Sequence, residues 1–145
     1  MIKTIQHSST ILALFAFVLT IAFAAIPGCA AQNSPLQITA SSKTTIVLPT
    51  DTIPSEETAA KELQHYLTQI TGSDCKVVAE NAGTALQGTV IYVGPTQFAK
   101  AHLTDKSTFA DEEWTMQTSG NALILDGGRP RGTLYAVYHF LEDVA

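Results

Sequence analysis

Two arginines, Arg129 and Arg131, have the type and placement best suited to recognising an acidic group. They precede the predicted last helix, at the end where its dipole is positive, so each guanidinium needs an acidic partner. In a functional role, that partner is a neighbouring domain or an acidic sugar such as a uronate, whose carboxylate fits the arginine fork. The alternative is an ion pair within the chain, with Glu112 or Glu113. Tyr135 lies off the apolar stripe of the helix and joins them as a candidate interdomain or sugar contact.

The acidic residues do not form a pair suited to glycoside hydrolysis. That reaction needs two carboxyl groups about 5–5.5 Å or 6.5–9.5 Å apart. Glu112 and Glu113 are adjacent at the start of a predicted strand and therefore point to opposite faces. Glu142 and Asp143 fall on the exposed side of the last helix, and Asp126 is placed to cap a turn. We therefore expect no catalytic residue in this chain.

The histidines and cysteines indicate neither a metal site nor a nucleophile. His65, His102 and His139 form no H-E-x-x-H motif and no pair spaced i, i+4 on one helix. No serine lies in a nucleophile elbow. Cys75 has no histidine close by in sequence and is interpreted as a packed thiol. We expect no metal and no cofactor.

The first 31 residues have the pattern of an export signal. An apolar core at 11–26 follows a weakly basic start and ends in small residues, and it is shorter than the ~20 residues that span a bilayer. The sequence Ile26-Pro27-Gly28-Cys29 resembles a bacterial lipobox, in which Cys29 becomes the diacylated amino terminus. Ordinary signal-peptide cleavage is the alternative. We therefore expect an exported protein that meets a membrane only through this signal or a lipid anchor.

The composition is that of one globular domain with an acidic surface. The 145 residues are 46% apolar and 14% charged, with a formal net charge of −5. From residue 29 onward, 7 basic residues face 13 acidic ones, which gives −6. No basic patch or series of stacking aromatics is present, so a nucleic-acid partner is not expected.

The apolar patterns predict an α+β fold, with a mostly antiparallel or mixed sheet and helices packed on one face. Strands are predicted at 36–40, 44–48, 76–79, 89–93, 113–117 and 121–126, and helices at 55–70, 97–103 and through the last residues. The last two strands form a hairpin whose predicted inward side chains are Trp114, Met116, Leu123 and Leu125.

The first long helix, 55–70, has signals at both ends. Ser55 is the predicted cap, and Gly72 lies just past the last turn. Its predicted buried stripe is Ala59, Ala60, Leu63, Tyr66, Leu67 and Ile70.

The last helix is amphipathic and has no glycine after it. Its predicted stripe is Leu134, Val137, Tyr138, Leu141 and Val144, and Tyr135 and Phe140 lie off that stripe. Since no stop signal follows, we expect more protein after Ala145. We also expect this helix to pack on that further domain.

Three segments together resemble a known family. They are IVLPTDTIPSEETAAKELQHYLTQITG, IYVGPT and EEWTMQTSGNALILDGGRPRGTLYAVYHFLEDV, and residues 36–145 are assigned to one domain on this basis. They resemble the small amino-terminal domain that precedes the catalytic barrel of alpha-glucuronidases, and beta-N-acetylhexosaminidases have a similar domain. The most specific parts are Ala59–Leu63, Val93-Gly94 and the glycine-rich block that begins at Gly127.

The resemblance implies an accessory domain without a catalytic centre of its own. The hydrolytic carboxylates would belong to a carboxy-terminal catalytic barrel domain of the same protein, the expected partner, with carbohydrate as a further candidate partner. The alternative is a freestanding lipoprotein module that binds carbohydrate without chemistry.

Overall fold

The computed structural model describes residues 36–80, 86, 88–104 and 108–144. Five strands and three helices are found in these residues: β1 (Thr44–Leu48), α1 (Pro54–Thr71), β2 (Cys75–Ala79), β3 (Thr89–Val93), α2 (Gln97–His102), β4 (Trp114–Ser119), β5 (Ala122–Gly127) and α3 (Gly132–Val144). The predicted signal segment, with Cys29, lies outside the described residues.

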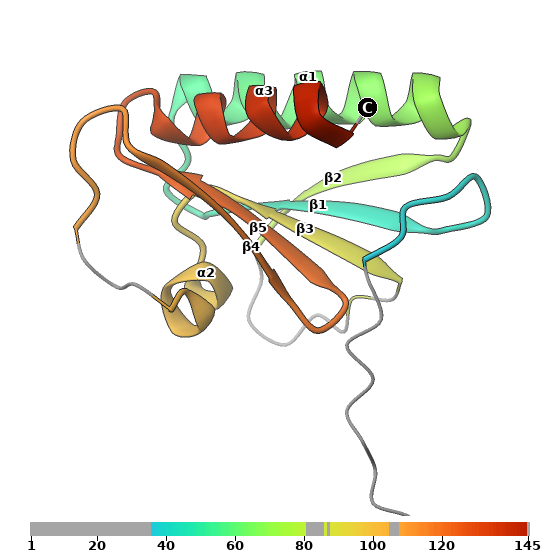
Figure 1. The fold of residues 1–145 in the computed structure, drawn as a ribbon, viewed down its shortest axis with the longest axis horizontal. Helices are drawn as coiled ribbons and strands as arrows, with labels where there is room; N and C mark the ends of the chain where they lie inside the picture. The colour runs from blue at the N-terminus through green and yellow to red at the C-terminus, as the bar shows by residue number, and fades with distance from the viewer. Residues whose placement is uncertain (1–35, 81–85, 87, 105–107, 145) are drawn as a thin grey trace, which may run out of the picture. The chain divides into compact units, whose positions relative to one another are not determined.

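The strands form one mixed sheet in the order β2-β1-β3-β5-β4 (Figure 1). β1 runs parallel to β2 and β3, and β3 runs parallel to β5. β4 alone is antiparallel to its neighbour, through the hairpin to β5. The predicted α+β class with a mixed sheet is confirmed.

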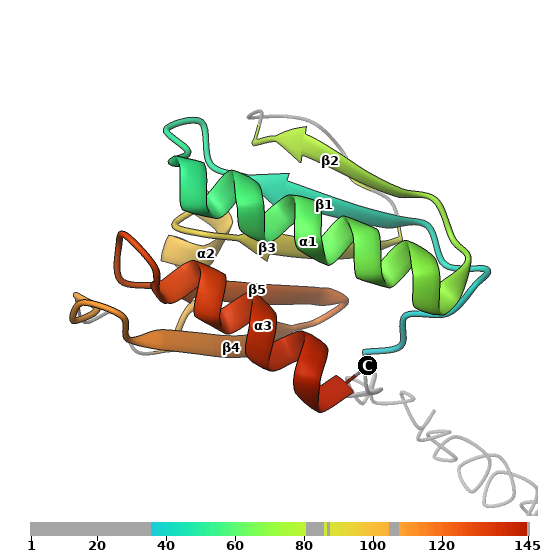
Figure 2. The same cartoon turned by 90° about the horizontal axis from the view of Figure 1, so that it is seen from above.

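The two long helices, α1 and α3, lie side by side over one face of the sheet (Figures 1 and 2). Between them and the sheet lies the main core, which includes Ile46, Leu63, Ile91, Leu125 and Val137. The short helix α2 lies on the opposite face, where Ala99 and Leu103 pack on Ile124. Successive side chains of a strand point to opposite faces of the sheet. Ile124 therefore points to the α2 side, whereas Leu123 and Leu125 point to the main core under α1 and α3.

The strand predicted at 36–40 is not formed. These residues lack regular structure, and a turn closes where the Ser42 N–H donates to the Thr39 carbonyl at 2.8 Å. Both hydrogen-bonding edges of β1 are already occupied by β2 and β3, so no edge of that strand remains for this segment. Its apolar residues Leu36 and Ile38 instead pack against the main core.

Helix α1 begins one residue earlier than predicted and is not capped by Ser55. Pro54 occupies the first helical position, which suits its fixed φ, and Ile53 is the N-cap. The Ser55 hydroxyl instead donates to the Pro130 carbonyl. The predicted end is confirmed: Gly72 adopts a left-handed φ of 67° and donates to the Thr68 carbonyl.

The buried stripe of α1 is narrower than predicted, whereas that of α3 is shifted around the helix from Tyr138 toward Ala136 and Phe140. On α1, Tyr66 and Ile70 are exposed. On α3, Phe140 is buried with Ala136 and Val137, whereas Tyr138 is 40% exposed. On β4, Trp114 is also exposed, and its ring stacks on His139 of α3 with centroids 4.4 Å apart.

Candidate functional site

The loops at the carboxyl ends of the parallel strands β1, β3 and β5 meet at one edge of the sheet. In open sheets with parallel strands, this edge is where ligands usually bind. The loops are those that follow Leu48, Val93 and Gly127. Arg129 and Arg131, the two arginines singled out in the sequence, both lie in the last of them.

Three glycines let the chain cross itself at this edge. A Cβ on Gly127 or Gly132 would overlap the Glu113 carbonyl oxygen, and one on Gly128 would overlap that of Ala110. The Gly128 N–H donates to the Glu113 carbonyl at 2.8 Å. The segment before β4 is therefore packed directly against the β5–α3 turn, and side chains at these glycines would separate them.

Arg129 is bound by two acidic residues of the first helix and its preceding loop. Its Nε donates to Glu56 Oε1 at 2.9 Å and its Nη2 to Glu56 Oε2 at 3.2 Å. Nη2 also donates to the Asp51 carbonyl at 2.9 Å, and Nη1 lies 3.3 Å from Asp51 Oδ2. The hydrogen bonds to Glu56 raise the pKa of Arg129. This fork is thus occupied within the domain and ties the β5–α3 turn to the start of α1.

Glu56 is the residue of this site that sequence reasoning missed. It is 1% exposed and, besides holding Arg129, accepts from the Ile53 N–H at 3.1 Å. Gly94 approaches it so closely that a Cβ there would lie 3.2 Å from the Glu56 carboxyl carbon. A signal was present, because Pro54 at the first helical position followed by Glu56 at the third is typical of a helix start.

The other predicted contacts are separate from this cluster. Arg131 Nη2 lies 3.4 Å from Glu112 Oε1, and both side chains are exposed. Glu112 is one of the two intramolecular partners considered for the arginines. Tyr135 is half-buried on α3. None of these contacts tests the predicted role of Arg129, Arg131 and Tyr135 in binding another domain or a sugar, which stays a prediction.

Asp126, at the end of β5, is buried beside this cluster. The residue is 3% exposed, and its Oδ1 accepts a hydrogen bond from the Gly127 N–H at 2.8 Å. Burial, opposed in part by that hydrogen bond, raises the pKa of Asp126 to about 6. The buried Thr133 hydroxyl is only a weak partner of this carboxylate, because it forms no hydrogen bond with the described residues.

The raised pKa predicts that ionised Asp126 destabilises the fold. The folded state holds this proton more tightly than the unfolded state, so stability falls as pH rises from about 4 to about 6. Asp126→Asn has no such carboxyl group, so its free energy of unfolding should not fall in this way. The stability of the variant minus that of wild type should therefore be about 2–3 kcal/mol larger at pH 7.5 than at pH 4. Urea unfolding of both proteins at the two pH values measures the difference. If the difference in unfolding free energy between variant and wild type were the same at both pH values, the claim that ionised Asp126 destabilises the fold would be contradicted.

A hollow of about 570 Å³ opens at this edge. It is lined by Asp51, Pro95, Lys100, Leu103, Thr108, Phe109, Asp126, Gly127, Gly128 and Arg129. Its volume lies within the range of small-molecule sites, which is about 300–1,000 Å³. The hollow thus combines apolar walls with acidic and basic side chains.

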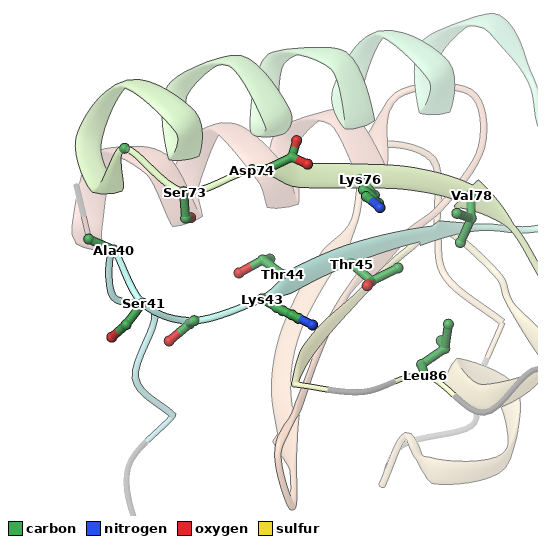
Figure 3. A pocket seen from close by; sticks show the side chains of 12 residues that line it. Ala40, Ser41, Lys43, Thr44, Thr45, Ser73, Asp74, Lys76, Val78 and Leu86 are labelled. Atoms are coloured by element: carbon green, nitrogen blue, oxygen red, sulfur yellow. The ribbon is translucent and has the colours of Figure 1, made fainter.

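A second hollow, of about 590 Å³, lies at the amino-terminal edge of β1 and β2 (Figure 3). Thr45, Lys76 and Val78 project from the two strands on one side, where Leu86 approaches them. Lys43 and Lys76 are exposed, and neither lies within 4 Å of a carboxylate among the described residues. Four of its polar lining residues, Ser41, Lys43, Asp74 and Lys76, are exposed, so this hollow excludes water poorly and is the weaker candidate.

Across the described ranges, no group of three or more His, Cys, Asp or Glu residues is arranged to hold a metal ion. Cys75 is buried, as predicted. In the same ranges, none of the helices has the length and apolar character needed to cross a membrane.

Fold and site together define an α+β domain with a ligand-sized hollow at the carboxyl ends of its parallel strands. The family model described as Glycosyl hydrolase family 67 N-terminus matches residues 28–140. That match is 113 of 145 residues, so the chain belongs to this family. The predicted resemblance to alpha-glucuronidase amino-terminal domains is confirmed. No match was found among curated proteins.

Membership in this family has two consequences. The domain is an accessory domain of a glycoside hydrolase, and it implies a catalytic domain in the same protein.

Proposed function

We propose that this chain is the accessory domain of an exported glycoside hydrolase that degrades polysaccharide or glucuronosides. Its work is to pack on the catalytic barrel through the side formed by α3 and β4. Residues 1–31 direct export, and lipidation at Cys29 would anchor the enzyme to a membrane surface. Residues 36–145 form the domain itself.

The observation that carries this proposal is the exposure of aromatic side chains on α3 and β4: Trp114 of β4, which stacks on His139 of α3, and Tyr138 of α3. Trp114 and Tyr138 are 36% and 40% exposed. Exposed aromatic rings of this kind are enriched where proteins make contact. His139 stacks on Trp114 and lies 3.8 Å from Glu142, so the surface has apolar rings with a polar rim. This is the arrangement expected of a domain interface.

Arg131 and Tyr135 lie on or next to the same helix. Arg131 makes an exposed pair with Glu112, and such pairs contribute little to stability. Its guanidinium is therefore free to exchange Glu112 for a carboxylate of the catalytic domain at little energetic cost. Arg129, by contrast, is held by Glu56 and Asp51 within the domain.

Oxidative footprinting tests this surface. We expect Trp114 and Tyr138 to be oxidised several-fold more slowly in the complete product of the gene than in the 145-residue chain, because the catalytic domain covers them. Tyr66, which is 43% exposed on α1, is the internal control and should be labelled equally in both. Equal labelling of Trp114 and Tyr138 in the two proteins would contradict docking through α3 and β4.

A second candidate function is a freestanding carbohydrate-binding lipoprotein module. The hollow at the carboxyl ends of the strands favours it, since an aromatic wall beside polar groups suits a sugar. The two candidates differ in their partner: the first requires a catalytic domain, whereas the second requires only the hollow.

A further inference from the structure

The hollow at the carboxyl ends of β1, β3 and β5 has walls of two kinds. Pro95, Leu103 and Phe109 supply an apolar wall on the α2 side of the sheet, where Leu103 and Phe109 belong to the smaller core. Thr108 and the backbone of Gly127 and Gly128 add polar groups. A ligand that fits here needs an apolar face and a polar rim.

Asp126 gives the hollow a fixed hydrogen-bond acceptor. Its side chain is buried and oriented by the Gly127 N–H bond to Oδ1. Among the described residues, no hydrogen bond is made to its second oxygen, Oδ2. Because the Gly127 N–H occupies Oδ1, Oδ2 is the oxygen of this carboxylate that is open to a further donor among the described residues. Since Asp126 lines the hollow, a ligand hydroxyl that enters it can donate to this carboxylate.

The charges around the hollow are balanced. Asp51 and Asp126 contribute two carboxylates, and Lys100 and Arg129 contribute two cations. Asp51 and Arg129 are paired with each other at 3.3 Å. Lys100 on α2 is exposed and lies close enough to Asp126 to lower its pKa. In the remaining pair, Asp126 can accept and Lys100 can donate a hydrogen bond. Because their charges are opposite, the pair favours a ligand without net charge.

We propose that this hollow binds one neutral pyranose ring of a saccharide, with its C–H face on Phe109 and its hydroxyls bonded to Asp126 and Lys100. A sugar hydroxyl both donates and accepts, so one carboxylate and one ammonium group satisfy neighbouring hydroxyls. The aromatic ring supplies the apolar contact. This inference rests on the proposed function only in taking carbohydrate as the ligand, and it requires no catalytic domain.

Saturation-transfer NMR on the 145-residue chain tests the site. The probes are the methyl glycosides of glucose, galactose, mannose and xylose, with free glucuronate as the charged comparison. We expect ring C–H signals from at least one neutral glycoside. Lys100→Ala and Phe109→Ala should each weaken its binding about tenfold or more. Lys76→Ala, in the other hollow, is the matched control and should bind as wild type.

The outcomes separate this site from its rivals. No transfer to any neutral glycoside, or transfer that survives both Lys100→Ala and Phe109→Ala, would overturn the proposal. Transfer to glucuronate alone would also overturn it, in favour of an anion site. The far-UV spectrum and thermal midpoint of each variant show whether a loss reflects unfolding, and Lys100, which is exposed on α2, is the variant least prone to it. Footprinting of Trp114 is independent of all these results, so docking and sugar binding can fail separately.

Discussion

Arg129→Met is expected to lower the free energy of unfolding by about 3 kcal/mol, because it leaves the Glu56 carboxylate buried without its cation. Glu56 is 1% exposed and cannot turn to water without moving the start of α1. The Arg129 side chain is 37% exposed, so solvent screening places the effect at the lower end of the range for broken buried pairs. Urea unfolding measures the change.

Two further variants isolate the cause. Arg131→Met removes an arginine two residues away whose pair with Glu112 is exposed, and it should change stability by no more than about 1 kcal/mol. Adding Glu56→Gln to Arg129→Met should recover part of the loss, since the unpaired charge disappears. If the two arginine variants were equally stable, the buried pair would not be what ties the β5–α3 turn to α1.

Gly128→Ala is expected to destabilise the domain by about 3 kcal/mol or more, at the upper end for overpacked sites. The new methyl group would overlap the Ala110 carbonyl oxygen and lie 3.3 Å from the Phe109 Cβ. The Gly128 N–H is hydrogen-bonded to the Glu113 carbonyl. The β5–α3 turn and the segment before β4 therefore cannot move apart to relieve the overlap without breaking this bond. Thermal unfolding followed by circular dichroism measures the loss.

Gly120→Ala is the matched control for this crossing. Gly120 has a left-handed φ of 59°, but nothing lies within 4 Å of an added Cβ. Its substitution should therefore cost about 1 kcal/mol, the strain of the backbone conformation alone. A Gly128→Ala variant no less stable than Gly120→Ala would show that the crossing tolerates a side chain.

The elements with a strong local signal were predictable, whereas those decided by tertiary pairing were not. The alternation and β-branched residues of 44–48 and 89–93 gave strands with the observed bounds. The residues 36–40 carry a similar alternation, but β1 has no free edge for them. On α3, periodicity placed a stripe correctly at Val137 but did not show that the sheet and α1 would turn Phe140 inward and Tyr138 outward.

The candidate site was predictable only in part for a similar reason. Charge at the start of a helix correctly indicated that the arginines need acidic partners. It did not identify Glu56, which is 73 residues away from Arg129 and reaches it only because β1 and β5 end at the same edge of the sheet. The burial of Asp126 likewise depends on loops distant in sequence.

Hydrolysis of a panel of aryl glycosides, glucuronides included, tests most directly whether this domain is accessory. The assay compares the 145-residue chain with the complete product of its gene, under the same conditions. We expect the complete product to release the aryl group and the 145-residue chain to release none. Turnover by the 145-residue chain alone, lost in Asp126→Asn, would contradict the accessory role and place a catalytic acid in the hollow at the strand ends.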